Sequence, residues 1–436
     1  MRMDRVKVVQ DPIHGSISLD GPYLSVMDRH EMQRLRSVRQ LGLSNLVFPG
    51  ANHTRFEHCL GTYHLAGRMA DVIGLDRDDS ATVRMAGLLH DVCHPPFSHA
   101  LEVVMERATG LDHMELARAL INGRIPNHRS CDSDMFGDSE PMSEIMSRFG
   151  ISSEEVCDLI EYPVTNTGPL DTFMGSNGHF PSHDYAHQII HGPVDADQMD
   201  YLMRDAYYTG IVHGSIDCER LINTMRLQND RIVIRRGGMV AAEGLMVSRA
   251  LMYTSVYFHE TVKIAERMLE KAVCEYDGDL SEIYLWSDVD LVSNLRASGG
   301  KSSMAIRRIM NRDIDKKAFA IYNGDATQEI LDRVMLFSGK GGQERLESEI
   351  ADVLGVDPFD ICVVVAPKSS LQSRIKIGKT DVAIADDEGR VRPITRFSPL
   401  ARSLQSRDTH GWSLVVASSD DMREKVARAT RKVLGL

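Results

Sequence analysis

"AGLLHDVCHPPFSHALE", residues 86–102, places three histidines and an aspartate within ten positions: His90, Asp91, His94 and His99. His90 and Asp91 are adjacent, so on a helix their side chains leave about 100° apart and can converge on one point. His94 follows His90 by four residues and therefore shares its helical face. Such crowding has two interpretations: a helix end whose histidines cap carbonyls or contact solvent, or a metal site.

The residues around this cluster predict a helix with two faces. Apolar side chains recur at helical spacing over residues 85–92 and predict a core stripe. His90, Asp91 and His94 fall on a different face. Pro95 forces the chain out of the helix directly after His94. We therefore expect one helix that presents these three side chains away from the core and ends at His94.

Two further windows show the same division into an apolar and a polar stripe. Residues 55–73 carry His58 on the polar side, and residues 195–209 carry Asp197 at the start of a polar stripe. Three helices thus offer four candidate metal ligands: His58, His90, Asp91 and Asp197. Two imidazoles with two carboxylates suit one borderline-to-hard divalent ion per chain, such as iron, manganese, magnesium or zinc.

Composition restricts the class of protein. The chain has 436 residues, of which 43% are hydrophobic and 26% charged, and this balance is typical of a folded protein with two or three domains. The net charge of −12 argues against nucleic-acid binding. The first residues lack the apolar segment of a signal peptide, and no apolar run approaches the length of a membrane span. Seven cysteines without a CxxC pair favour a reducing compartment, so we expect a cytoplasmic protein.

The spacing of apolar residues changes along the chain. It is mostly helical from residue 23 to about residue 275, with short β elements at residues 6–19 and 227–241. Beyond that point, strand-like runs alternate with helical segments. The strand-like runs are KAFAIY (317–322), DICVVVA (360–366), RIKIG (374–378), DVAIA (381–385) and WSLVVAS (412–418).

This organisation predicts a mainly α protein. We expect an all-helical core with short β-hairpins over residues 1–275 and a smaller α/β domain over residues 276–436. The second domain is a candidate for an oligomerisation or regulatory role. The segment of residues 127–141 is rich in Gly, Ser and Asp and predicts a loop.

Five motifs, in order along the chain, carry a family resemblance. They are KVVQDPIHGSISL (7–19), DRHEMQRLRSVRQLG (28–42), VFPGANHTRFEHCLG (47–61), LLHDVCHPPFSHALE (88–102) and VDADQMDYLMRDAYYTGI (194–211). Together they resemble the HD-domain metal phosphohydrolases, and among these the deoxynucleoside triphosphate triphosphohydrolase branch. The resemblance implies metal-dependent hydrolysis of a dNTP to a deoxynucleoside and inorganic triphosphate, with additional magnesium carried by the nucleotide.

The resemblance also implies roles for single residues. The four candidate ligands match the family's metal ligands. His94 matches a histidine placed against the scissile phosphate, Glu102 a carboxylate that orients it, and His113 a further catalytic histidine. The residues that match substrate contacts are Gln40, Leu41, Arg55, His99, Tyr201, Asp205 and Arg249.

A second constellation matches the family's activator site: Lys7, Asp28, Gln33 and Arg36. Gln33 and Arg36 lie one helical turn apart. A carboxylate at Asp28 can accept hydrogen bonds from N1–H and the exocyclic amine of guanine, and the two basic side chains supply charge for phosphates. The resemblance implies that GTP or dGTP binds there between subunits of a homo-oligomer, a dimer or a tetramer. The alternative is a charged helix face whose aspartate is favoured by the helix dipole.

The sequence departs from the family pattern at two positions. Cys93 stands where the family has glycine after its His-Asp pair, and Gln198 replaces a lysine next to the fourth ligand, so one positive charge near the triphosphate is missing. Two alternative functions therefore stay open. One is a different HD phosphohydrolase, acting on a nucleoside monophosphate, a cyclic dinucleotide or an alarmone. The other is a nucleotide sensor without catalytic activity.

Overall fold

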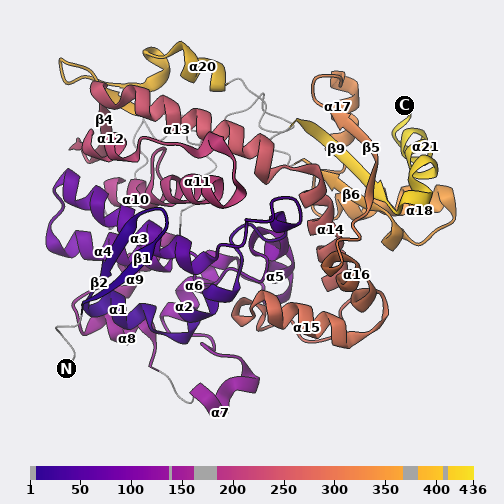
Figure 1. Cartoon of the computed structure of the whole chain (residues 1–436), viewed down its shortest axis with the longest axis horizontal. Coiled ribbons are helices and arrows are strands. Elements are labelled where there is room, and N and C mark those ends of the chain that lie inside the picture. Colours follow the sequence, from indigo (N-terminus) through magenta and orange to yellow (C-terminus); the bar gives the residue numbers. More distant parts are fainter. Residues whose placement is uncertain (1–5, 137–139, 162–183, 367–381, 406–410) are drawn as a thin grey trace.

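The computed structural model describes residues 6–136, 140–161, 184–366, 382–405 and 411–436. Over these residues the protein is predominantly helical, and its strands form three small sheets. Figure 1 shows that the first two thirds of the chain fold mainly into packed helices and that the carboxyl end forms a compact unit with a β-sheet. The prediction of a mainly α protein with a smaller α/β part is therefore confirmed. No helix within these ranges is both long enough and apolar enough to cross a membrane.

The helices that surround the candidate site come from the first 275 residues. They are α3 (Arg55–Ile73), α4 (Arg77–Leu89), α5 (Glu102–Thr109), α6 (His113–Ile121), α9 (Ser153–Ile160), α10 (Asp184–His191), α11 (Ala196–Thr209), α13 (Met239–Met252) and α14 (Glu260–Cys274). Helix α3 packs against both α4 and α11. Thr54 and Glu57 form a capping box at the start of α3, and Gly74 ends it in the left-handed conformation.

Shorter or more distant helices complete the molecule. They are α1 (Gly21–Met27), α2 (His30–Arg34), α7 (Ser133–Phe136), α8 (Met142–Ser147), α12 (Cys218–Asn223), α15 (Asp288–Ser298), α16 (Gly300–Met310), α17 (Gln328–Met335), α18 (Gly342–Leu354), α20 (Pro399–Gln405) and α21 (Arg423–Leu434). Helix α7 lies within the predicted loop of residues 127–141, of which residues 137–139 fall outside the described part.

The helix expected to extend to His94 is shorter than predicted. Helix α4 ends at Leu89, and His90 is its C-cap residue. Asp91 and His94 lie in the following turn, where the His94 amide donates to the Asp91 carbonyl over 3.1 Å. Pro95 and Pro96 disfavour the helical conformation at the residue before each of them, so the chain does not stay helical through His94.

Two antiparallel hairpins stand where the sequence predicts β structure. Strands β1 (Lys7–Asp11) and β2 (Gly15–Leu19) form the first, and β3 (Met225–Gln228) and β4 (Arg231–Arg235) form the second. Asn229 and Asp230 connect β3 to β4 with positive φ angles, as a two-residue turn requires. Strand β7 (Ala383–Ala385) pairs in parallel with β4, and β8 (Val391–Pro393) completes that sheet.

The carboxyl-terminal sheet has the strand order β5–β9–β6, all antiparallel. Its strands are β5 (Lys316–Tyr322), β6 (Cys362–Val365) and β9 (Trp412–Ser418). Alternate side chains face opposite sides of a sheet, and here both sides are buried. Val363 and Val416 belong to a small core with the last helices, whereas Val364 and Val415 belong to the main core. Four predicted strands are confirmed, and the fifth, residues 374–378, lies outside the described residues.

The main hydrophobic core extends across residue 275. It includes Leu269 and Val273 before that point and Leu291, Leu295 and Ile306 after it. The division into domains at this position stays a prediction, since a continuous core joins both sides.

Asp288, at the start of α15, connects the carboxyl-terminal part to two loops of the helical part. Its carboxylate accepts hydrogen bonds from the backbone amides of Phe97, over 2.8 Å, and Arg39, over 3.2 Å. Phe97 has a φ of 56°, a conformation that costs energy in any residue with a side chain. Burial raises the pKa of Asp288 to about 6, although both amide hydrogen bonds oppose this shift.

This pKa predicts how stability depends on pH. Between the ordinary pKa near 4 and the folded value near 6, the folded state binds more protons than the unfolded chain, so the free energy of unfolding falls as pH rises. Asp288→Asn removes this term. The stability advantage of the wild type over Asp288→Asn should therefore shrink by about 2 kcal/mol between pH 4 and pH 7 in urea unfolding.

Asp290→Asn is the matched control on the same helix. Burial opposes ionisation of Asp290, but its contacts with Ser287 and Arg129 prevail and lower its pKa. The stability that it contributes is complete above its ordinary pKa, so its difference from the wild type should be constant over this range. A growing advantage of wild type over Asp288→Asn with rising pH would contradict the assignment.

Candidate active site

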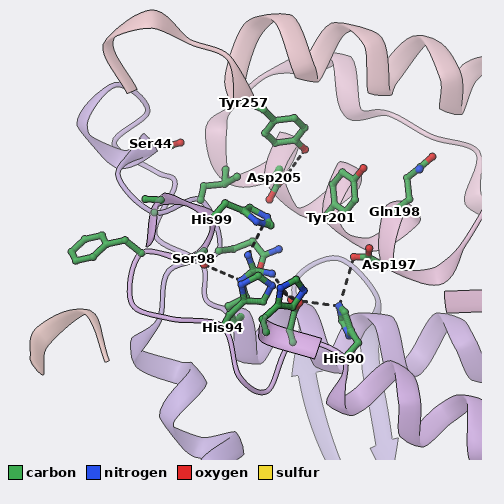
Figure 2. Close-up of a pocket in the computed structure, with 18 of the residues that line it drawn as sticks. Ser44, His90, His94, Ser98, His99, Asp197, Gln198, Tyr201, Asp205 and Tyr257 are labelled. Atoms are coloured by element: carbon green, nitrogen blue, oxygen red, sulfur yellow. Dashed lines mark hydrogen bonds and ion pairs between the residues drawn. The ribbon is translucent and has the colours of Figure 1, made fainter. Parts of the chain in front are cut away.

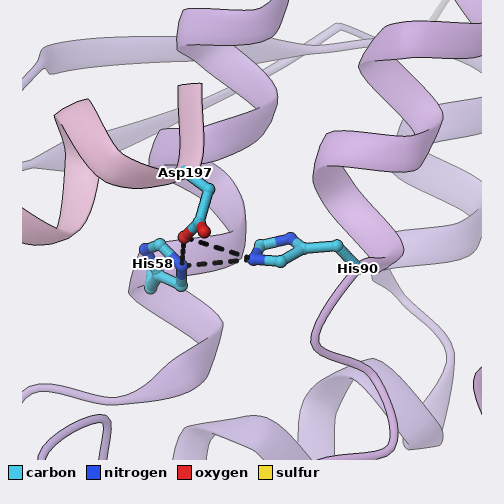
Figure 3. Close-up of side chains that lie close together, drawn as sticks. All are labelled: His58, His90 and Asp197. Carbon is cyan, nitrogen blue, oxygen red and sulfur yellow. Dashed lines mark hydrogen bonds and ion pairs between the residues drawn. The ribbon is translucent and has the colours of Figure 1, made fainter. Parts of the chain in front are cut away.

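The candidate metal ligands converge where α3, α4 and α11 meet. His58 Nε2 lies 3.0 Å from Asp197 Oδ1 and 3.2 Å from His90 Nε2, and His90 Nε2 lies 3.7 Å from the same carboxylate oxygen. Figure 3 shows the three side chains directed toward one point from three separate segments. The structure thus brings together residues that are up to 139 positions apart, from His58 to Asp197.

Asp91 adds a fourth candidate ligand atom to this group. Its Oδ2 lies 3.6 Å from His58 Nε2 and 3.4 Å from His90 Nε2. Ligand atoms about 2.1 Å from a common divalent ion are roughly 3 to 3.5 Å from their neighbours. The ligand atoms of His58, His90 and Asp197 all lie within 4.8 Å of one another, a spacing that fits one metal ion, and Asp91 Oδ2 approaches both imidazoles of this group. The mixture of imidazole and carboxylate donors also suits a divalent ion.

The orientation of both imidazoles is fixed from behind. His58 Nδ1 lies 2.7 Å from Asp200 Oδ2, and His90 Nδ1 lies 3.0 Å from the carbonyl oxygen of Gly87. A proton on each Nδ1 would donate to these acceptors and leave each Nε2 lone pair directed at the metal position. Carboxylates and backbone carbonyls are the usual partners that orient metal-binding histidines in this way.

Charge at this position also favours a cation. Burial disfavours the charged imidazole of His58, but the Asp197 and Asp200 carboxylates outweigh it and raise the pKa of His58 to about 10. The carboxylates around His58 therefore favour positive charge at this point, whether a proton or a metal ion supplies it. Because a metal ion replaces protons on its ligands when it binds, its affinity rises with pH.

A second group of histidines surrounds Glu102. Glu102 Oε1 lies 2.8 Å from His99 Nδ1, 3.3 Å from His94 Nδ1 and 4.0 Å from His113 Nδ1. The rings of His94 and His113 are stacked with their centres 4.5 Å apart. Glu102 is thus shared among the three predicted active-site histidines, and its shortest contact is with His99 rather than His94.

His94 connects the two groups. Its Nε2 lies 3.0 Å from Asp91 Oδ1. Burial, together with the nearby Arg55 guanidinium, lowers the pKa of His94 to about 3, so the imidazole is neutral in this arrangement. A neutral imidazole can accept a hydrogen bond at one nitrogen and donate at the other.

Arg55 connects the loop after α4 to the candidate metal ligand Asp91. Its Nη1 donates to the Asp91 carboxylate, its Nε donates to the Ser98 hydroxyl over 2.9 Å, and its Nη2 lies 3.2 Å from His99 Nε2. The side chain is buried. Its positive charge therefore offsets the negative charge of Asp91, and Arg55 lines the pocket.

These groups border a cavity of about 460 Å³, a size that accommodates a nucleotide. Twelve of the residues predicted for the site line it: Gln40, Leu41, Arg55, His90, Asp91, His94, His99, His113, Asp197, Tyr201, Asp205 and Arg249. His58 and Glu102 are not among the lining residues and act from behind them. Figure 2 shows His90 and Asp197 at one side of the pocket and Ser44 at the other.

The middle of the cavity contains a polar arrangement that the sequence predicted only in part. Asp205 Oδ1 lies 2.8 Å from His53 Nε2, and Asp205 Oδ2 accepts a hydrogen bond from the Tyr257 hydroxyl over 2.7 Å. The sequence identified Asp205 but neither of its partners. Tyr257 ends a π-helical turn that directly follows α13, and the spacing of such a turn differs from that of an α-helix, so α-helical periodicity could not place it.

Asp200 and His14 were also missed as functional residues. Asp200 lies on the polar stripe of α11, one turn from Asp197, and His14 lies between the strands of the first hairpin. His14 Nε2 is 2.7 Å from Asp200 Oδ1. Both are polar side chains that are buried and paired with each other, and the sequence alone does not show this burial.

The predicted activator residues lie apart from the cavity, on the surface near α1 and α2. Lys7 Nζ forms an ion pair with Asp28 over 2.9 Å. Gln33 Nε2 donates to the carbonyl oxygen of Met27, next to Asp28, and Arg36 Nε donates to Gln33 Oε1. These contacts gather the four predicted side chains on one part of the surface.

Comparison with known proteins gives two matching family models. The HD domain model matches residues 55–204, and the HD associated region model matches residues 216–436. The chain is 32% identical over 434 residues to an uncharacterized protein of Methanocaldococcus jannaschii, with 96% of this chain and 81% of that protein covered.

An enzyme and a solved structure are also similar to the chain. The chain is 30% identical over 300 residues to human deoxynucleoside triphosphate triphosphohydrolase SAMHD1; the match covers 64% of this chain and 46% of that enzyme, so the chain spans about half its length. The crystal structure of a phosphohydrolase from Bacteroides thetaiotaomicron superimposes with a TM-score of 0.70 at 23% identity, covering 95% of this chain and 100% of that one. That likeness shows the fold.

Removal of one ligand tests the metal position. Asp197→Ala should lower the metal content of the purified protein at least tenfold, because the remaining ligands lose a charged donor. Elemental analysis after dialysis against a limiting metal concentration measures this. Asp71→Ala, at an exposed carboxylate on α3, is the control and should retain the metal. Undiminished metal content in Asp197→Ala would remove Asp197 from the site.

Proposed function

The chain belongs to the HD-domain dNTPase-like family, and from this premise we propose that it hydrolyses deoxynucleoside triphosphates to deoxynucleosides and inorganic triphosphate. The observation that carries the proposal is the continuity of the cavity. One pocket joins the candidate metal ligands His90 and Asp197 to the predicted sugar contacts Gln40, Leu41 and Asp205. A ligand with a phosphate group at one end and a sugar next to it therefore fits the order of the side chains.

The metal would be held by His58, His90, Asp91 and Asp197. When bound, a divalent ion supplies positive charge for a phosphoryl oxygen and makes a water molecule more acidic. Arg55 and Arg249 add two positive charges that the protein itself brings to the cavity. These charges offset the negative charge that a triphosphate accumulates during the reaction.

The reaction breaks the bond between the α-phosphorus and the 5′ oxygen of the nucleoside. Water supplies the new oxygen of the triphosphate, and the 5′ oxygen takes a proton as it leaves. His94 lies between Asp91 and Glu102, where an imidazole can move that proton. Glu102 also contacts His99, so one carboxylate orients both rings.

The sugar region supports a deoxyribose. Asp205 has both carboxylate oxygens engaged, one by His53 and one by Tyr257. A group held on both sides cannot move aside for a larger ligand without losing a buried hydrogen bond, which costs about 1–3 kcal/mol. An additional hydroxyl on the sugar would meet this fixed arrangement.

Product analysis tests the proposed reaction. The holoenzyme should convert each accepted dNTP into a deoxynucleoside and inorganic triphosphate in equal amounts, and ribonucleoside triphosphates should react at least tenfold more slowly. Ion-exchange chromatography of a panel of dNTPs and NTPs with several metals resolves both products. Release of orthophosphate or pyrophosphate instead would reject this reaction, and turnover of a nucleoside monophosphate, a cyclic dinucleotide or an alarmone alone would favour a different HD phosphohydrolase.

We also propose that GTP or dGTP binds at the surface site of Lys7, Asp28, Gln33 and Arg36 and stabilises a homo-oligomer. Asp28 is about half exposed, and its carboxylate is held by the Lys7 ammonium group. A guanine base can offer it two N–H donors, while Lys7 and Arg36 supply charge for the phosphates. Binding that favours the assembled state raises its population by mass action.

Substitution of Asp28 tests this activator site. GTP should promote assembly and raise the hydrolysis rate of the wild type, and Asp28→Ala should abolish both effects while the metal content is unchanged. Light scattering and initial rates measure the two effects. Asp20→Ala, at the exposed residue before α1, is the control and should respond to GTP as the wild type does. One unchanged assembly state with full activity, with and without GTP, would rule out the site.

A further inference from the structure

The cavity contains a charged pair that has no role in the reaction described above. Lys263 and Glu266, on α14, both line it, and Lys263 Nζ lies 2.7 Å from Glu266 Oε2. Phe258, just before this helix, also lines the cavity, and Lys263 Nζ lies 5.6 Å from the centre of its ring. An aromatic face and a donor–acceptor pair thus occur within the width of one nucleobase.

This pair differs from the ordinary ion pairs on helix surfaces. Lys263 and Glu266 side chains are 24% and 18% exposed, whereas Arg333 and Glu329 on α17 are 39% and 76% exposed. Exposed pairs are screened by water and contribute little. The charges of a pair that lines a cavity are less screened by water, and its donor and acceptor keep a fixed orientation. Such a pair can therefore recognise a ligand.

The start of α14, which precedes the pair, lies near the loop that carries Ser44. The N-cap residue of α14, His259, meets the Phe48 ring edge to face over 5.8 Å. Phe48 belongs to the same loop as Ser44. Figure 2 shows Ser44 across the pocket from Asp197 and Gln198. With the phosphates at Asp197 and the sugar at Asp205, this end of the cavity receives the nucleobase.

We propose that Lys263 and Glu266, with Phe258 as a stacking face, form a base-recognition site that separates guanine and thymine from adenine and cytosine. The ammonium group of Lys263 only donates hydrogen bonds, and the carboxylate of Glu266 only accepts them. Guanine and thymine present a carbonyl oxygen beside a ring N–H. Adenine and cytosine present an amino group beside a bare ring nitrogen, which is the reverse order.

The order of the pair decides which class binds better. The metal and the sugar contacts fix the ligand at its other end, so a base cannot turn over to match its edge to the pair. One class of bases then places its acceptor at Lys263 and its donor at Glu266. The other class places a donor against the Lys263 ammonium group and an acceptor against the Glu266 carboxylate, so neither hydrogen bond forms. Leaving buried polar groups without partners is what makes such sites selective.

The inference rests on the proposed function for the position of the ligand, and its test separates the two. Binding of α,β-imido analogues of the four dNTPs to the metal-loaded protein is measured by calorimetry, and hydrolysis of the four dNTPs is measured in parallel. The wild type should favour one class at least tenfold, for dGTP over dATP and for dTTP over dCTP, or the reverse in both pairs. Lys263→Met and Glu266→Gln should bring both ratios to within about threefold of one.

A charge swap provides the sharper variant. Lys263→Glu combined with Glu266→Lys keeps the ion pair but reverses its order, so the preferred class should change. Glu329→Gln, at the exposed pair on α17, is the matched control and should keep the wild-type ratios. Unchanged thermal stability and affinity for inorganic triphosphate in the variants would show that the phosphate end is intact.

Two results would overturn the proposal. One is a wild type that binds both classes equally, and the other is a set of variants whose ratios stay within twofold of the wild type. A protein that binds the analogues selectively but hydrolyses none of the dNTPs would retain the base site and reject the proposed reaction. A protein that hydrolyses the dNTPs, with the wild-type selectivity ratios in all variants, would retain the proposed reaction and reject the base site.

Discussion

The carboxylate of Asp200 is the interaction on which the site depends. It is fully buried, and it contacts His58 Nδ1 and His14 Nε2, each over 2.7 Å. Arg204 donates to both of its oxygens over 2.9 Å. A buried carboxylate is stable only when its charge is paired and its lone pairs are occupied, and loss of one partner from such a pair costs about 3–5 kcal/mol. All three neighbours must therefore keep their positions, and one of them is the candidate metal ligand His58.

This requirement extends from the candidate metal site to the amino-terminal hairpin. Arg204 also donates a hydrogen bond to Asp11, at the end of β1, over 2.8 Å. The Asp11 carboxylate in turn accepts hydrogen bonds from the backbone amides of Ile13 and His14. The turn between β1 and β2 is thereby shaped by the same buried charges that orient His58. Because Lys7 lies at the other end of β1, the hairpin connects the proposed activator surface to the residues behind the metal ligands through one short strand.

The sequence predicts the elements better than it predicts the roles of their polar residues. Helix α3 covers the predicted window, since its capping box and terminal glycine are local signals. Asp197 and Asp200, however, lie one turn apart on the same polar stripe of α11. Helical spacing alone therefore does not distinguish their roles. The sequence identified Asp197 as a candidate ligand but gave Asp200 no role, because the contacts of Asp200 with His58 and with His14 of the hairpin form only in the packed structure. Similarly, alternation predicts β7, but nothing local indicates that it pairs in parallel with β4.

The carboxyl-terminal part contacts α14, which contributes Lys263 and Glu266 to the pocket. Arg267, on this helix, donates to both carboxylate oxygens of Glu347 on α18, over 2.9 and 2.8 Å, and both side chains are buried. Glu347 also accepts the backbone amide of Val363 on β6, so helix and sheet are fixed to one carboxylate. Lys263 lies one turn before Arg267 on the same helix. The wall of the cavity that carries Lys263 is therefore held in place by contacts with residues beyond 275.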